Sequence, residues 1–194
     1  MEHIRKAQQN HYRGLLEKHA GTPMAVSSES AAHKRLRFDQ IAKVFSNDDS
    51  FSLHDIGMGL GAFGSYLIEN YPNRNIVYSG SEILPEFVDG ARAAHPSSFF
   101  YCRDIAEHPG DECYDYVILS GVFHQRRQTS ISDWEKFSRK ILRTAFSMCR
   151  KGWAFNFISP FVDFYQTEVY YANLPRVINF VVEELSRFFV INHC

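Results

Sequence analysis

The sequence lacks the patterns that mark several classes of protein. Its 194 residues contain no apolar run of 18 residues, and the opening MEHIRKAQQN has no apolar region of the kind found in signal peptides. The four cysteines show no CxxC pairing, and the nine histidines show no HxH or HxxxH spacing. Nothing therefore indicates a membrane span, a disulfide scaffold or a metal site, and we expect a cytoplasmic protein of a reducing compartment.

The chain also lacks an excess of charge of either sign. The 21 Lys and Arg residues are balanced by 22 Asp and Glu residues, for a formal net charge of −1. We therefore expect neither nucleic acid nor a membrane as a partner. Residues 1–44 nevertheless hold eight basic and four acidic residues. This imbalance predicts a basic helical cap over residues 1–45 on an acidic body over residues 46–194, the two forming a single structural unit.

Strand-like and helix-like segments alternate through the body. Helices are predicted at residues 4–19 and 30–45, separated by a break at Gly21-Thr22-Pro23, and then at 62–71, 84–94, 132–149 and 174–186. The helix at 132–149 is predicted to begin with a capping box, Ser132-x-x-Glu135. Strands are predicted at 51–56, 75–79, 98–102, 116–119, 153–158 and 188–191. This alternation predicts a doubly wound, mostly parallel α/β sheet preceded by N-terminal helices.

A glycine-rich loop, HDIGMGLGAFG, follows the first predicted strand. Gly57, Gly59 and Gly61 alternate there, and glycine lets a ligand approach backbone N–H groups near the start of a helix. The G-x-G-x-x-G that starts at Gly59 also matches the dinucleotide fingerprint. Asp55 argues against a dinucleotide, because its carboxylate would repel a pyrophosphate in a partly desolvated loop. The loop therefore predicts a nucleotide-like ligand that carries positive charge.

This Asp-x-Gly-x-Gly-x-Gly arrangement resembles the signature of the class I S-adenosylmethionine-dependent methyltransferases, whose ligand carries an ammonium and a sulfonium but no phosphate. The resemblance covers about residues 51–191 and implies a Rossmann-like sheet with S-adenosylmethionine as the cofactor. It also implies that Glu82, at the end of the second strand, binds the ribose hydroxyls. Asp104 and the apolar Ile105, after the third strand, would then hold the adenine.

The same resemblance implies further residues of the cleft. Ser120 lies in the loop after the fourth strand, which lines the methyl-transfer cleft in that superfamily. Arg37 and Tyr12, on the predicted cap, are further expected cofactor contacts, with Arg37 reaching the ligand's carboxylate. A role for Arg37 as an ordinary surface arginine is the alternative.

Three segments, DYVILSGVF, GWAFNF and YYA, look like a group of bacterial small-molecule methyltransferases of the natural-product type. The resemblance implies a small-molecule acceptor. The chain departs from the superfamily in two ways. Three residues follow the predicted sixth strand, so either the usual seventh strand is absent or the chain has been shortened. The Asn/Asp-Pro-Pro-Tyr of amino-methylating nucleic-acid enzymes is absent as well.

Three residues are candidates for catalysis. His124 follows the fourth strand, where an imidazole can take a proton near neutral pH. Tyr170 and Tyr171 lie in an aromatic stretch where a substrate lid is expected. Adjacent side chains cannot point the same way, so at least one tyrosine is predicted to face the pocket. A structural histidine and aromatic core packing are the alternatives.

The predicted activity is in-line methyl transfer to a small-molecule acceptor by a monomer or homodimer. An intramolecular cyclase that consumes S-adenosylmethionine and releases methylthioadenosine is one alternative. A noncatalytic S-adenosylmethionine-binding module is another. An NAD-dependent oxidoreductase is disfavoured mainly by Asp55.

Overall fold

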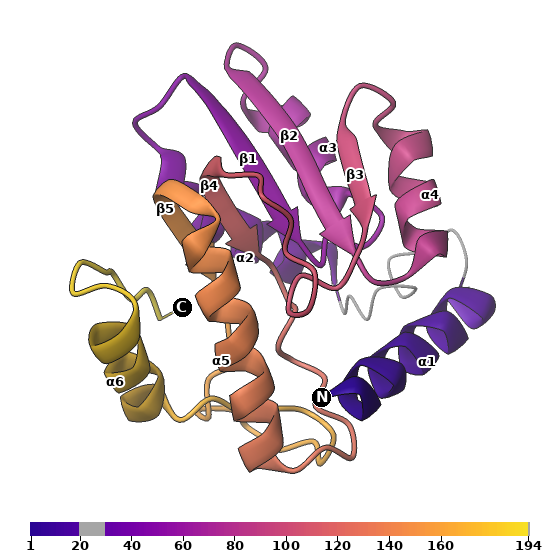
Figure 1. Cartoon of the computed structure of the whole chain (residues 1–194), viewed down its shortest axis with the longest axis vertical. Coiled ribbons are helices and arrows are strands. Elements are labelled where there is room, and N and C mark those ends of the chain that lie inside the picture. The colour runs from indigo at the N-terminus through magenta and orange to yellow at the C-terminus, as the bar shows by residue number, and fades with distance from the viewer. Residues whose placement is uncertain (20–29, 194) are drawn as a thin grey trace.

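The computed structural model describes residues 1–19 and 30–193, so the predicted break at Gly21-Thr22-Pro23 and Cys194 lie outside the described residues. It is a parallel five-stranded sheet of order β3-β2-β1-β4-β5, flanked by helices (Figure 1). The strands are β1 Ser50–Ile56, β2 Asn75–Glu82, β3 Phe99–Cys102, β4 Tyr114–Leu119 and β5 Cys149–Phe155. The α-helices are α1 Glu2–His19, α2 Ala31–Ala42, α3 Ala62–Asn70, α4 Pro85–Ala94, α5 Ile131–Ser147 and α6 Leu174–Glu184, and the 3₁₀ helix Lys43–Phe45 follows α2.

Both faces of the sheet are buried, as the doubly wound prediction requires. Side chains of β4 alternate between two apolar clusters: Val117 and Leu119 pack on one side with α5 and α6, while Tyr116 and Ile118 pack on the other. The second cluster includes side chains of α2, α3 and α4. This alternation follows from the two-residue period of a strand, and burial on both faces explains why β4 is a continuous apolar run.

The sheet order places a crevice beside β1. The chain runs from β1 outward to β3 and then returns to β4 on the other side of β1. β1 therefore pairs with both β2 and β4, and the connections after β1 and β4 leave the sheet in opposite directions. In open α/β sheets, ligands bind outside the carboxyl ends of the strands at such a switch point.

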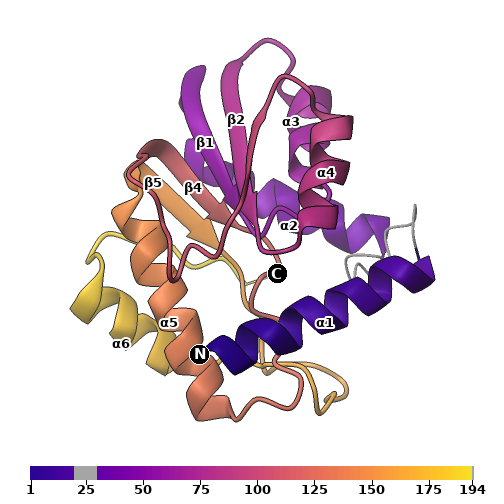
Figure 2. The same cartoon turned by 45° about the vertical axis from the view of Figure 1, so that its right-hand side comes forward.

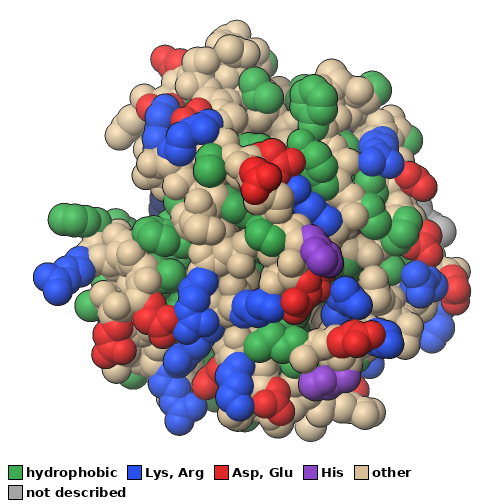
Figure 3. Space-filling model, viewed as in Figure 1, with side chains coloured by type: hydrophobic (Ala, Val, Ile, Leu, Met, Phe, Trp, Pro, Cys, Tyr) green, Lys and Arg blue, Asp and Glu red, His purple; other side chains and the backbone are tan. Residues whose placement is uncertain are grey.

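Helix α1 lies across this carboxyl end of the sheet (Figure 2). Its Ile4 is buried in the apolar cluster that includes α5, and two of its basic residues pair with acids of the body. Arg5 lies 3.7 Å from Asp104, and Arg13 lies 2.9 Å from Glu86. On the face shown in Figure 3, Lys and Arg side chains are interspersed with Asp and Glu. The basic excess of residues 1–44 thus contributes to docking the cap on the body.

The strand predicted at residues 188–191 is wrong. Phe188 is 95% exposed and Val190 is 84% exposed, and the described residues form no strand there. Apolar residues form a strand only when a neighbouring strand accepts their backbone hydrogen bonds, and here Phe188 bonds locally to Ser186 instead. Among the described residues the sheet therefore has five strands.

Two element boundaries also differ from the prediction. The cap of α5 is Ser130, not Ser132: the Ser130 hydroxyl accepts from the backbone N–H of Asp133, and its backbone is extended as a cap requires. The helix ends at Ser147, and the fifth strand begins at once, because Tyr114 on β4 pairs with Cys149. Among the described residues, no helix combines the length and hydropathy needed to cross a bilayer.

Candidate functional site

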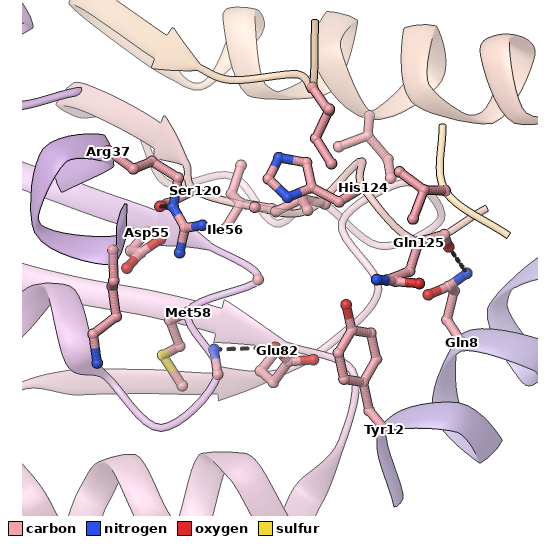
Figure 4. A pocket seen from close by; sticks show the side chains of 18 of the residues that line it. Gln8, Tyr12, Arg37, Asp55, Ile56, Met58, Glu82, Ser120, His124 and Gln125 are labelled. Atoms are coloured by element: carbon pink, nitrogen blue, oxygen red, sulfur yellow. Dashed lines mark hydrogen bonds between the residues drawn. The ribbon is translucent and has the colours of Figure 1, made fainter. Parts of the chain in front are cut away.

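A cavity of about 960 Å³ lies at the carboxyl ends of the central strands, bordered by α1, α2 and residues 158–171. Figure 4 shows side chains of α1, of α2 and of the ends of the central strands converging on it. Most predicted site residues line the cavity: Tyr12, Arg37, Asp55, Gly57, Gly59, Glu82, Asp104, Ile105, Ser120, His124 and Tyr171. Gly61 and Tyr170 are not among its lining residues.

Asp55 is 2% exposed near the end of β1. The Tyr78 hydroxyl donates to its Oδ2 at 2.9 Å, but no described residue pairs with its Oδ1. Burial and the nearby Glu82 raise the pKa of Asp55 to about 7, against the lowering effects of the Tyr78 hydrogen bond and Arg37. A buried carboxylate oxygen without a donor is costly, so this position favours a ligand that donates hydrogen bonds and carries positive charge.

The glycine loop adopts a backbone that other residues strongly disfavour. Gly57, Gly59 and Gly61 have φ of +70°, +57° and +78°. A Cβ at Gly57 would lie 2.8 Å from a methyl of Val122, and one at Gly61 would lie 2.9 Å from the ring of His95. Gly61 is the N-cap of α3, and its carbonyl oxygen lies 2.9 Å from Nε2 of His95, so its role is to shape the turn rather than to line the cavity.

Glu82 ends β2 with its carboxylate held by backbone donors. The N–H of Gly59 donates to Oε2 at 3.2 Å, and the N–H of Ile83 donates to Oε1 at 2.6 Å. Burial nevertheless raises the pKa of Glu82. Each oxygen retains a lone pair for a ligand hydroxyl. Tyr12 points toward the same region (Figure 4), and burial together with Glu82 raises its pKa to about 12, so it is a neutral hydroxyl donor.

Asp104 and Ile105 follow β3 as predicted, but α1 covers Asp104. The Asp104 Oδ1 accepts from the N–H of Ala106 at 2.9 Å, and its Oδ2 faces Arg5 of α1. Ile105 is 4% exposed and supplies an apolar wall. The pair therefore offers a flat apolar contact beside an acceptor.

Arg37 reaches the cavity from α2. Its Nε donates to the Ser120 hydroxyl at 3.0 Å, which joins the cap to the loop after β4. Burial lowers the pKa of Arg37, while Asp55 and Tyr12 raise it. Among the described residues Arg37 forms no ion pair, and an arginine stays protonated in proteins, so its cationic end is available to a ligand anion.

His124 lines the cavity and contacts Asn156, which follows β5. The Asn156 amide lies 2.9 Å from Nε2 of His124 and accepts from the N–H of Gly121 at 2.8 Å. Burial, and then the charge of Arg37, lower the pKa of His124 to about 4. The ring is therefore neutral at physiological pH.

The two tyrosines point in opposite directions, as expected for neighbours. Tyr171 lines the cavity, and its hydroxyl accepts from the N–H of Gln166. Tyr170 is 4% exposed in the core, with its hydroxyl 3.2 Å from Glu135. The structure thus corrects the inclusion of Tyr170 among the cavity residues, because its side chain packs on α5 and α6. Whether Tyr171 takes part in catalysis stays a prediction.

Sequence reasoning missed Gln8, Gln125 and Asn156. Gln8 is 6% exposed, donates to the backbone oxygen of Gln125 at 2.6 Å, and lines the cavity. A glutamine on a polar helix carries no signal for such a role. Asn156, a lone polar residue in the apolar run WAFNFI, was the one available clue. Among the described residues no cluster of His, Cys, Asp and Glu could hold a metal ion.

Comparison with known proteins agrees with this architecture. No protein-family model matches the chain. The chain is 23% identical over 156 residues to the candidate methyltransferase Rv1506c of Mycobacterium tuberculosis, covering 78% of this chain and 90% of that protein. The magnesium protoporphyrin IX methyltransferase ChlM of Synechocystis PCC 6803, with bound SAH, shares its fold with a TM-score of 0.67 at 12% identity, over 93% of this chain and 88% of that chain.

A second solved structure, the [4+2]-cyclase SpnF, gives a TM-score of 0.64 at 17% identity, over 93% of this chain and 71% of that chain. These structural similarities agree with the fold indicated by the sheet order and by the glycine loop after β1. The chain therefore has the fold of the class I S-adenosylmethionine-dependent methyltransferases.

Proposed function

We propose that this chain is an enzyme that binds S-adenosylmethionine and transfers its methyl group to a small-molecule acceptor. The observation that carries the proposal is the buried Oδ1 of Asp55, which has no partner among the described residues and lies beside the glycine loop. An ammonium group supplies both the missing donor and a positive charge, and so favours the ionised carboxylate. A pyrophosphate would instead meet repulsion there.

The other cavity residues fit the remaining parts of this cofactor. Glu82, fixed by two backbone N–H groups, offers acceptors for the ribose hydroxyls. Arg37, which forms no ion pair with any described residue, offers a cation to the ligand's carboxylate. Ile105 and Asp104 offer an apolar face and an acceptor for the adenine. The methyltransferase relatives, one of them a structure with bound SAH, support the same reading.

When bound, S-adenosylmethionine supplies an already activated methyl group. The chain's own contribution is to orient two ligands and exclude water, for which α1 and residues 158–171 border the cavity. Holding two reactants in line can lower a barrier by roughly 7–11 kcal/mol. Orientation alone therefore accounts for a large share of the expected rate enhancement.

Calorimetry tests the cofactor. We expect S-adenosylmethionine and S-adenosylhomocysteine to bind with low-micromolar to tens-of-micromolar dissociation constants and NAD not to bind. Tighter binding of NAD would overturn the assignment.

The reaction is tested by its nucleoside product. Because SpnF is a cyclase with this fold, the fold alone leaves the reaction open. After incubation with S-adenosylmethionine and a cell extract, S-adenosylhomocysteine in the mass spectrum supports methyl transfer. Methylthioadenosine would instead indicate intramolecular cyclisation, and binding without either product a noncatalytic module. A cytoplasmic location and a monomeric or homodimeric state stay predictions.

A further inference from the structure

Asn156 connects His124 to the backbone of the loop after β4. One atom of its amide lies 2.8 Å from the backbone nitrogen of Gly121, and the other lies 2.9 Å from Nε2 of His124. A backbone N–H can only donate. The atom that faces Gly121 is therefore the Asn156 oxygen, and the atom that faces His124 is the amide nitrogen.

This hydrogen-bond chain fixes the proton on the imidazole. An amide nitrogen only donates, so Nε2 of His124 accepts and carries no proton. A neutral imidazole then carries its proton on Nδ1. No described residue accepts a hydrogen bond from this Nδ1, and the ring borders the space between Ser120, Gln125 and Tyr12 (Figure 4).

We infer that Asn156 is a positioning residue that holds His124 as the neutral Nδ1–H tautomer, so that His124 offers the cavity ligand a hydrogen-bond donor and not a base. Protonating Nε2 would set two donors against each other. Turning the Asn156 amide over to relieve this contact would set its nitrogen against the N–H of Gly121. Both alternatives lose a part-buried hydrogen bond and leave its polar groups unsatisfied.

The surroundings of the His124 ring also favour its neutral form. Burial lowers the pKa of His124, and Arg37 on α2 is the charged group that lowers it further. Asp55 and Glu82 also line the cavity, but neither shifts this pKa. The lone pair of Nε2 is thus occupied by the Asn156 amide, and no neighbouring carboxylate draws the proton away from Nδ1.

The consequence for the substrate rests on the proposed function. Without a base at His124, the attacking atom must reach the cavity already ionised, or its lone pair must be able to attack without prior loss of a proton. Its electron pair would form the bond to the methyl carbon of S-adenosylmethionine, while the bond from that carbon to the sulfonium sulfur breaks and leaves the neutral thioether of S-adenosylhomocysteine. The Nδ1–H of His124 holds a hydrogen-bond acceptor on the substrate. A neutral alcohol, which must lose its proton, is the acceptor class least suited to this site.

Histidine-selective ¹⁵N NMR of the unliganded protein tests the tautomer, with His124→Gln identifying the signal. We expect a neutral, Nδ1-protonated ring throughout pH 5–8. In Asn156→Asp, one carboxylate oxygen keeps the Gly121 bond and the other accepts from Nε2–H. The proton should therefore move to Nε2, and the pKa of His124 should rise by about one to three units. The matched control is Asn173→Asp, the same change at the cap of α6, where Asp caps equally well.

A wild-type ring protonated on Nε2, or one that titrates near its ordinary value, would overturn the inference. So would an Asn156→Asp ring unchanged in tautomer and pKa. The wild-type spectrum decides the matter even if the variant fails to fold. A parallel titration with S-adenosylhomocysteine separates the two proposals: absent binding with an Nδ1–H ring refutes the cofactor alone, and binding with an Nε2–H ring refutes the role of Asn156 alone.

Discussion

A carboxyl group with a pKa of about 7 makes Asp55 a pH-dependent element of the site. Only its ionised form attracts an ammonium. The dissociation constant of S-adenosylhomocysteine should therefore rise as pH falls below 7, approaching tenfold per pH unit. Calorimetry between pH 5.5 and 8 measures this slope.

Asp55→Ala should abolish binding at micromolar concentrations, and Asp55→Asn should leave only weak binding without this slope. The exposed Asp111→Asn serves as the control and should retain wild-type behaviour. Unchanged affinity in both Asp55 variants would refute the ammonium contact.

Glu82 and Glu86 provide a matched pair of substitutions. Glu82 lines the cavity, whereas Glu86 pairs with Arg13 outside it. Glu82→Ala should weaken S-adenosylhomocysteine by about 1.5–3 kcal/mol, as for hydrogen bonds to a charged group. Glu86→Ala should change the affinity little. Equal losses in both variants would mean that Glu82 does not hold the ribose.

Single residues were predictable where a strand end fixes their position. Four site residues lie at or just beside the carboxyl end of a parallel strand, so the topology brings them together: Asp55, Glu82, Asp104 and Ser120. Asn156 was not predictable, because its role depends on a contact with a loop 35 positions away. Alternation predicted that one of the two tyrosines faces the cavity, but which of them does depends on the packing of α5 and α6.

At the scale of elements, the glycine loop tolerates little change. Gly61→Ala places a Cβ 2.9 Å from His95 at φ of +78°, so we expect a loss of about 1–3 kcal/mol in the free energy of unfolding. Gly14→Ala, inside α1 with no atom within 4 Å of the added Cβ, should instead be neutral or stabilising by up to about 1 kcal/mol. Urea denaturation compares the two variants. An unchanged free energy of unfolding in Gly61→Ala would show that the backbone of the turn can shift to accommodate the added Cβ.

Elements with a strong apolar period were predictable, and their ends were not. The buried run of β4 and the apolar face of α5 follow from pattern alone. Ser130 and Ser132 are both good caps, and the choice between them depends on where Trp134 enters the core. The run at 188–191 has strand-like composition but pairs with none of the described strands, which no local pattern reveals.

At the scale of the whole molecule, Asp55 links the free energy of unfolding to pH: its protonated form favours the folded state, whereas its ionised form is the one expected to bind the ligand. Its pKa is raised on folding, so the folded state binds a proton more tightly than the unfolded state. The stability this provides is full below the unfolded pKa and is lost as pH rises through about 7. Relative to Asp55→Asn, the wild type should therefore gain about 2 kcal/mol in unfolding free energy between pH 7 and pH 5.

Urea denaturation of both proteins at several pH values measures this difference. The comparison must be made between variants, because burial lowers the pKa values of His54 and His124 and gives them the opposite pH dependence. A pH-independent difference would show that Asp55 is ionised in the unliganded protein.

The docking of α1 has a kinetic consequence. Arg5 covers Asp104, and the amides of Gln8 and Gln9 donate to the backbone oxygens of Gln125 and Ile83 at the rim of the cavity. We expect a ligand that binds at Asp104 to require these contacts to open. In stopped-flow experiments the observed association rate should level off at high S-adenosylhomocysteine concentration, at the rate at which α1 lifts. Removing the Gln9 amide should raise that ceiling, which would show that a helix of the cap sets the speed at which this protein captures its ligand.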